Sequence, residues 1–190
     1  MSYNRTVVLA AAAALSLSLA SIMGVSAVQA SVVTVGGAPM YSQKNIVQNA
    51  VNSKDHTTLV AAVKAAGLVD TLSGPGPFTV FAPTNAAFDK LPAGTVDTLV
   101  KPENKATLTK ILTYHVVAGH LTAADLKAKI KEGGGKAVLT TVEGGMLTVT
   151  ESGGKLMLTD EKGGMSDITI ANVLQSNGVI HVVDTVLMPN

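Results

Sequence analysis

Apolar and polar positions alternate with a period of two between residues 78 and 82, which predicts a β-strand. Pro83 lacks the backbone donor that would continue the ladder, so we expect the strand to end there. Thr84 is a candidate N-cap for a short helix that would turn Phe88 inward. The segment therefore predicts a corner at which a strand leads directly into a helix.

A second apolar run, residues 179–186, is almost uninterrupted and rich in valine. Strands that are covered on both faces have this composition. Asn177 and Gly178 come directly before the run and are typical of a tight turn. We therefore expect a buried strand whose side chains, His181 included, serve packing rather than chemistry.

Apolar residues recur at helical spacing in several short segments around the first strand. The clearest stripe, in residues 57–67, ends at Gly67, a common stop for a helix. Further helical segments are expected at residues 68–72, twice between residues 95 and 114, and at residues 123–130, with a brief strand at residues 115–117.

Glycine pairs recur about every ten residues in the last third of the chain, as they do where strands are joined by tight turns. The segments between the pairs alternate Thr and charged residues with Val, Leu and Met. Helices first and strands last favour an α+β domain over a doubly wound one. The expected antiparallel meander has strands at residues 138–142, 146–150, 155–159 and 168–171.

The first thirty residues have the pattern of a signal peptide. Arg5 is the only charge before Lys44, residues 6–25 are apolar or small, and small residues lead to Ala30, where we expect cleavage. The apolar stretch is also long enough to remain as a membrane anchor, since about twenty residues span a bilayer. A lipoprotein anchor is excluded because the chain has no cysteine. The protein is thus expected to be secreted or periplasmic.

We accordingly divide the chain into a signal peptide at residues 1–30, a flexible leader at residues 31–44 and one domain at residues 45–190. A chain of this size can bury about two-thirds of its unfolded surface in a single core. Without cysteine, that core rests on apolar burial alone. We expect no second domain.

Removal of Arg5 with the signal peptide leaves 13 basic and 13 acidic residues, so the exported chain has no formal net charge. Such a balance provides no field that attracts polyanions. With three Tyr, three Phe and no long basic run, nucleic acid is excluded as an expected partner.

The candidate catalytic and metal-binding groups are sparse. His115 and His120 lie five residues apart across a strand and a turn, without the cysteine or acidic partners of a metal site. Ser, His and Asp184 are available, but the Gly-x-Ser-x-Gly turn of serine hydrolases is missing. We expect no enzyme activity, no metal and no cofactor, and we interpret His115 and His181 as buried structural residues.

Three segments together resemble the fasciclin domain family: residues 78–88, Tyr114 to Val117, and residues 177–184 with the run to Pro189. The resemblance covers roughly residues 45–190. It implies a β-rich wedge, built from an antiparallel meander and two signature strands, flanked by several short helices. The motif residues expected to support this structure are Phe81, Pro83, Thr84, Asn85, Phe88, Asn177, Gly178 and His181.

The same resemblance implies a role in cell adhesion. In the family, the Tyr-His segment and an Asp-Ile pair before the closing box are implicated in integrin binding. Tyr114 and His115 match the first, whereas Asn172 and Val173 stand where the Asp-Ile pair would be. Without that carboxylate, a charge-assisted contact to a receptor-bound cation is not available. These four residues are nevertheless the candidates for contact with a partner.

Two functions of different kinds follow. The first is an exported adhesion or interaction module, similar to secreted single-domain fasciclin proteins of bacteria, that binds a surface protein or an envelope or matrix polymer. The second is a carrier of an apolar small molecule such as a lipid or pigment, because Met residues supply adaptable walls for a groove. Those methionines are Met146, Met157, Met165 and Met188.

Overall fold

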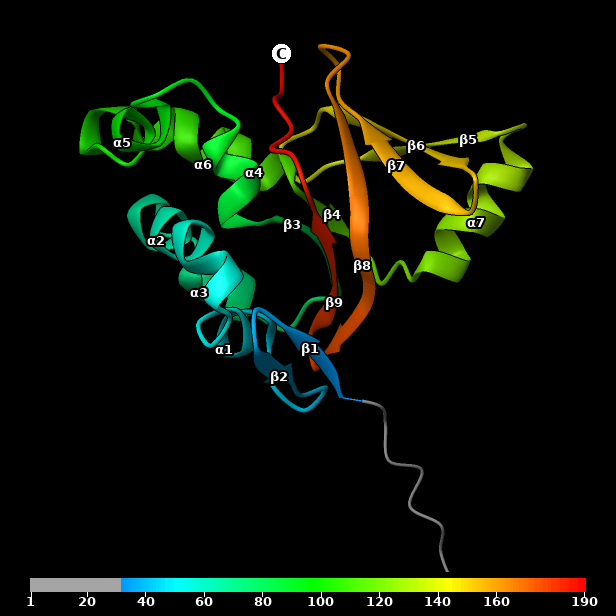
Figure 1. Ribbon diagram of the computed structural model, residues 1–190, viewed down its shortest axis with the longest axis horizontal. Coiled ribbons are helices and arrows are strands. Elements are labelled where there is room, and N and C mark those ends of the chain that lie inside the picture. Colours follow the sequence, from blue (N-terminus) through cyan, green and yellow to red (C-terminus); the bar gives the residue numbers. More distant parts are fainter. Residues whose placement is uncertain (1–31) are drawn as a thin grey trace, which may run out of the picture.

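The protein is a β-rich wedge whose helices lie mostly on one side (Figure 1). The computed structural model describes residues 32–190, so the predicted signal peptide lies outside the described residues. A seven-stranded sheet runs in the order β4-β3-β9-β8-β7-β6-β5. Its strands are β3 (Phe78–Pro83), β4 (Val116–Ala118), β5 (Lys136–Thr140), β6 (Met146–Ser152), β7 (Lys155–Thr159), β8 (Met165–Gln175) and β9 (Gly178–Val183).

The helices are short and fall into two groups. In Figure 1 the helices α1 to α6 lie on one side of β3 and β9, and α7 lies on the other side, beside β5 to β7. The first group consists of α1 (Ile46–Ala50), α2 (Thr57–Ala66), α3 (Val69–Ser73), α4 (Asn85–Asp89), α5 (Thr95–Leu99) and α6 (Lys105–Tyr114), with 3-10 turns at Lys54–His56 and Pro102–Asn104; α7 is Ala123–Glu132.

The two signature strands, β3 and β9, are neighbours near one end of the sheet and run parallel, with Phe81 opposite His181. Their side chains alternate between two hydrophobic cores. Val80 and Val182 pack into the core beneath α1 to α6, and Phe81 and Val183 pack into the core shared with the meander and α7. Because both faces of β9 are covered, all six of its residues are buried.

Strands β5 to β8 form the predicted antiparallel meander. Alternate residues point inward, where Leu139, Leu147 and Leu158 pack with Leu126 of α7 in the second core. The intervening residues form the outer face. This arrangement confirms the expected α+β wedge.

The two ends of the sheet approach one another. Val117 in β4 forms a bridge with Thr141, just beyond β5, and Val142 N donates to Val116 O at 2.7 Å. This contact almost closes the sheet into a barrel and satisfies edge groups that would otherwise be open for pairing.

The structure differs from the flexible leader expected at residues 31–44. Strands β1 (Val33–Val35) and β2 (Ala38–Met40) form an antiparallel hairpin there. Its inward side chains, Val35, Ala38 and Met40, are buried in the first core. The hairpin is too short to show a clear period in the sequence, and its stability comes from this burial.

Candidate functional site

The opening motif forms the expected corner between β3 and α4. Pro83 is the last residue of the strand, and Thr84 Oγ1 accepts a hydrogen bond from Ala87 N at 3.2 Å as the N-cap of α4. Asn85 then links the corner to the helical layer, because its Oδ1 accepts from Thr58 N at 3.0 Å. Phe88 is buried in the first core. The motif thus joins strand, corner and helix α2 into one unit.

The closing motif begins with a buried asparagine that joins helices to the sheet. Asn177 Oδ1 accepts from Ile46 N at 3.0 Å, and its Nδ2 donates to Leu72 O and Gly74 O, both at 2.8 Å. The next residue, Gly178, lies against β3. A Cβ atom there would be 2.0 Å from Phe78 O, so only glycine allows β9 to start at this position.

Tyr114, the first residue of the Tyr-His pair, lies inside the second core with no exposed surface. Its hydroxyl donates to Met146 O at 2.6 Å and accepts from Glu161 N at 3.2 Å. Burial raises the pKa of Tyr114 to about 12, so the hydroxyl keeps the proton that it donates. Tyr114 therefore holds the start of β6 and the turn after β7 together.

His115 is also buried, at the junction of α6 and β4. Its Nδ1 donates to Ile111 O at 2.9 Å, and its Nε2 accepts from Leu187 N at 3.0 Å. Burial lowers the pKa of His115 to about 4, so the ring is neutral at pH 7. Both ring nitrogens are occupied, which leaves neither of them free for a proton transfer or a metal.

His181 has a comparable setting on β9. Its ring stacks on Phe81 with centroids 5.7 Å apart, and its Nε2 donates to Leu121 O at 2.8 Å. Burial lowers the pKa of this histidine too. Its Nδ1 accepts from Asn172 N at 3.4 Å, which connects it to an irregular part of β8.

Asn172 occupies that irregular part. The register of β8 against β9 shifts between Ile170 and Val173, and Asn172 takes a left-handed φ of 60°. Its side chain is exposed to solvent, but its Oδ1 accepts from Ala123 N, the first residue of α7, at 2.7 Å. Asn172 therefore connects the bulge to a helix terminus.

The structure does not gather the four predicted partner-binding residues into one exposed patch. Tyr114, His115 and Val173 are each at most 2% exposed, and Asn172 is the one with a solvent-exposed side chain. A role for these residues in partner binding stays a prediction. In this conformation the three buried residues are not accessible to a partner.

The outer face of the meander is the first feature that sequence reasoning did not identify as a site. Val138, Met146 and Met165 are 54%, 59% and 60% exposed. Alternation alone could have shown that these residues share a face. The outer face consists of Lys136, Val138, Thr140, Met146, Thr148, Thr150, Ser152, Lys155, Met157, Thr159, Met165 and Asp167.

A cavity beneath the helices is the second such feature. It has a volume of about 60 Å³ and lies between α1, α2 and α3 and the face of β3 and β9 that bears Val80 and Val182. Almost all of its lining is aliphatic. Two of the few polar lining residues, Ser53 and His56, are bonded to each other, with Ser53 Oγ 2.9 Å from His56 Nδ1. Residues from distant parts of the chain form this space, so no local sequence signal marks it.

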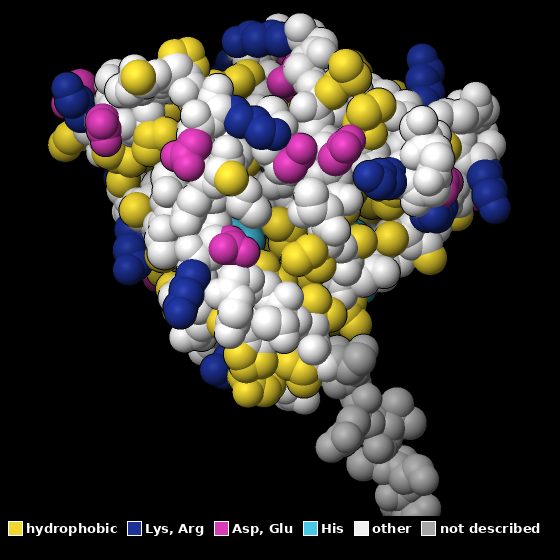
Figure 2. Space-filling view, in the orientation of Figure 1, with side chains coloured by type: hydrophobic (Ala, Val, Ile, Leu, Met, Phe, Trp, Pro, Cys, Tyr) yellow, Lys and Arg dark blue, Asp and Glu magenta, His cyan; other side chains and the backbone are white. Residues whose placement is uncertain are grey.

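None of the four methionines expected to line a groove belongs to this cavity; Met40 of β2 does. Within residues 32–190, no group of three or more His, Cys, Asp and Glu side chains is placed to hold a metal ion. No helix in the same range has the length and apolar character needed to cross a membrane. On the face shown in Figure 2, acidic and basic side chains are interspersed.

Comparison with known proteins gives consistent matches. The profile of the Fasciclin domain family matches residues 54–189. Protein sll1483 of Synechocystis sp. is 46% identical over 156 residues, which are 82% of this chain and 79% of that protein. Immunogenic protein MPB70 of Mycobacterium bovis is 40% identical over 153 residues, with 78% and 70% of the two chains covered.

A relative at the cell surface also matches. Cell surface glycolipoprotein MPB83 of Mycobacterium bovis is 35% identical over 159 residues, which are 81% of this chain and 64% of that protein. Among solved structures, a FAS1 domain pair from the insect cell adhesion molecule fasciclin I superimposes with a TM-score of 0.68. The two share 20% sequence identity, and the match covers 76% of this chain and 51% of the insect chain, so it supports the fold.

Proposed function

Because this chain belongs to the fasciclin domain family, we propose that it is an exported, non-enzymatic interaction module that binds a surface protein or an envelope or matrix polymer. Its relatives include a protein named for the cell surface, and the fold matches part of an insect cell adhesion molecule. Export itself follows from the predicted signal peptide and is part of the proposal.

The observation that carries this proposal is the open outer face of the meander. It presents Val138, Met146 and Met165 to solvent among threonines, with the charged residues Lys136 and Asp167 at the two sides of the row that contains Met157. Exposed apolar surface of this kind marks interaction sites more often than scattered single residues do. Flexible Met side chains adapt to the shape of a partner, and Thr hydroxyls donate and accept hydrogen bonds.

The experiment compares attachment of cells that lack the gene and of cells that carry it. Deletion should reduce attachment, and the purified domain should compete with attachment of the wild type. The double variant Val138→Glu and Met165→Glu should lose competition, because two carboxylates would have to be desolvated in the contact. Val51→Glu is the matched control, since Val51 is 49% exposed but lies after α1, away from the meander.

If the double variant competes as well as the wild type, the outer face is not the contact surface. If deletion of the gene leaves attachment unchanged and the domain does not compete, adhesion is not the function.

A second candidate function, carriage of an apolar small molecule, is favoured by the aliphatic cavity between the helices and the sheet. Native mass spectrometry of the protein purified from its own host should then show a bound lipid or pigment. An unliganded mass would reject a carrier role.

A further inference from the structure

The cavity beneath the helices has an inner part whose polar side chains bond to other groups of the protein. Ser53 Oγ and His56 Nδ1 bond to each other, and His56 Nε2 lies 3.4 Å from Ala82 O. His115, also in the lining, has both nitrogens bonded to backbone. A ligand therefore finds no free donor among these side chains, and a polar group placed there would lose most of its hydrogen bonds to water.

The inner part is also without charge. Burial lowers the pKa of His56 and of His115, so both rings are neutral at pH 7. A carboxylate or an ammonium group placed against them would be desolvated without a counter-charge. Only the apolar part of a ligand fits this end of the cavity.

The mouth of the cavity has different chemistry. The lining residues that are only half-buried are Val47 and Ala50 of α1, Val60 of α2 and Val69 of α3, so the opening lies between these three helices. Lys64 is one turn beyond Val60 on α2 and also contributes to the lining.

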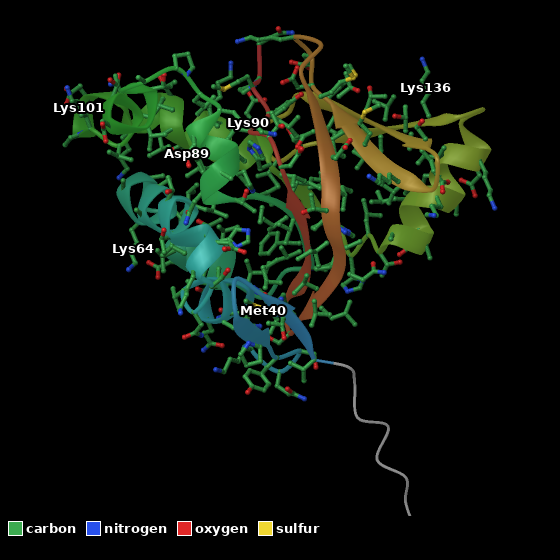
Figure 3. All side chains as sticks on the ribbon, viewed as in Figure 1. Met40, Lys64, Asp89, Lys90, Lys101 and Lys136 are labelled. Atoms are coloured by element: carbon green, nitrogen blue, oxygen red, sulfur yellow. The ribbon has the colours of Figure 1, made fainter. Side chains whose placement is uncertain are left out.

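Lys64 provides the charge at this mouth. Its side chain is exposed and points away from the sheet (Figure 3). It forms no salt bridge with any residue of the described range 32–190. A lysine of this kind places its aliphatic stem along the apolar wall and its ammonium group in water.

The size of the space limits the ligand. A cavity of about 60 Å³ holds about four to six water-sized groups, when each needs about 10–15 Å³. A linear or branched chain of about that many carbons fills it. Met40, a flexible side chain in the wall, provides some adaptability.

We propose that this cavity binds a single short aliphatic chain that carries an anionic head group, with the chain inside and the head group beside Lys64. The inference rests on the second candidate function above and specifies its ligand class. The apolar, uncharged inner end dictates the orientation, and the single lysine at the mouth dictates the sign of the head group.

The test uses hexanoate, hexan-1-ol and hexylamine as probes of equal chain length, titrated into the purified protein. Binding is followed by the methyl resonances of Met40 and the lining valines. Hexanoate should shift these resonances and bind several-fold more tightly than hexan-1-ol, and hexylamine should bind most weakly. The difference between hexanoate and hexan-1-ol should shrink in high salt, because the ammonium group of Lys64 is exposed.

Two variants locate the site. Ala50→Leu should block the mouth of the cavity and weaken hexanoate binding by at least about tenfold while the protein stays folded, since a larger side chain then occupies the space through which the aliphatic chain passes. Lys64→Gln should weaken hexanoate by several-fold and leave hexan-1-ol unchanged. Lys101→Gln is the control, because Lys101 is an exposed lysine outside the cavity lining (Figure 3).

The inference is overturned if none of the three probes shifts the lining methyl groups, or if Ala50→Leu leaves hexanoate affinity unchanged. If hexanoate and hexylamine bind equally tightly and Lys64→Gln changes neither affinity, the proposal of an anionic head group is overturned. Binding of hexanoate by a protein that carries nothing when isolated from its host would support the site while rejecting the carrier function.

Discussion

Single buried polar side chains connect the layers of this molecule. Asn177 is the clearest case, because its one amide group bonds to the start of α1 and to two carbonyl groups at the end of α3. It is only 7% exposed, so water does not replace these partners easily. The asparagine holds the helical layer at the turn where β9 begins.

Replacement of Asn177 by Ala should therefore lower the free energy of unfolding by about 2–4 kcal/mol, since three buried backbone groups lose their partner. Urea denaturation provides the measurement. Asn52→Ala is the matched control, because Asn52 is exposed and makes one side-chain hydrogen bond, to Gln48 O. That control should change stability by less than about 0.5 kcal/mol. Similar losses in the two variants would contradict the role assigned to Asn177.

A substitution of His115 can distinguish a structural role of this residue from a role in partner contact. In His115→Asn, the amide can still donate toward Ile111 O, but it is too short to accept from Leu187 N as well. The unfolding free energy should fall by about 1–3 kcal/mol, the cost of one unsatisfied buried group. Unchanged stability together with lost competition for cell attachment would instead assign His115 to the partner interface.

At the scale of elements, the junction between β8 and α7 depends on one residue with two functions. Asn172 takes a left-handed conformation at the bulge and accepts a hydrogen bond from the first residue of the helix. The helix also has its own N-cap, Thr122, which forms a capping box with Asp125. Asn172 therefore supplements an existing cap and orients α7 relative to the sheet.

Three substitutions of Asn172 should separate these functions. Asn172→Asp keeps the acceptor and places a negative charge at a helix N-terminus, so stability should be equal or slightly higher. Asn172→Gly keeps the left-handed conformation but loses the hydrogen bond from Ala123 N, which should lower the free energy of unfolding by about 1 kcal/mol. Asn172→Ala loses both the bond and the favourable conformation, which should lower it by about 2 kcal/mol. In thermal unfolding, the melting temperature should be highest for Asn172→Asp, lower for Asn172→Gly and lowest for Asn172→Ala. A glycine variant less stable than the alanine variant would contradict the conformational part of this argument.

The elements with a strong local period were predictable from the sequence. Strand β7 has the bounds expected from alternation, residues 155–159, and α2 ends at Gly67 as expected. The hairpin β1–β2 was missed because three-residue strands have almost no period. Strand β8 extends over 165–175, well beyond the expected 168–171, because its bulge interrupts the alternation.

The candidate site was less predictable, for a physical reason. Sequence indicates which residues are polar, but the exposure of a side chain depends on the elements packed around it. Tyr114 and His115 were candidates for contact with a partner, yet α6, the meander and the chain near Leu187 enclose them. The cavity, likewise, exists only where helices from the first half of the chain meet strands from both halves.

For the whole molecule, the most general consequence concerns pH. His56, His115 and His181 are buried, and burial lowers the pKa of each below its ordinary value of 6.5. In the unfolded chain the same residues titrate near 6.5. Between pH 6.5 and the lower pKa values of the folded state, the unfolded chain binds more protons than the folded one. Stability should therefore be greatest above pH 6.5 and should fall as the pH is lowered.

The size of this loss can be estimated from His115 alone. Its pKa falls from 6.5 to about 4, and one pKa unit corresponds to about 1.4 kcal/mol, so this residue accounts for a loss of about 3 kcal/mol by pH 4. His56 and His181 should add to it. Asp184 acts in a lower window: burial raises its pKa, but bonds from Asp167 N, Thr185 and Lys90 outweigh this and lower it. Its contribution is lost only as the pH falls below about 3.8.

Urea denaturation at several pH values between 7.5 and 4 tests this prediction, with variants that identify the residues responsible. His115→Asn should show a smaller loss of stability over this range than the wild type, although it is less stable at pH 7. Asn177→Ala is the control, because it removes buried hydrogen bonds but no titratable group, so its pH dependence should match that of the wild type. If His115→Asn and the wild type lose the same free energy between pH 7 and pH 4, burial of this histidine is not what couples the fold to pH. A fold that buries three neutral imidazole rings would then need another source for any acid sensitivity it shows.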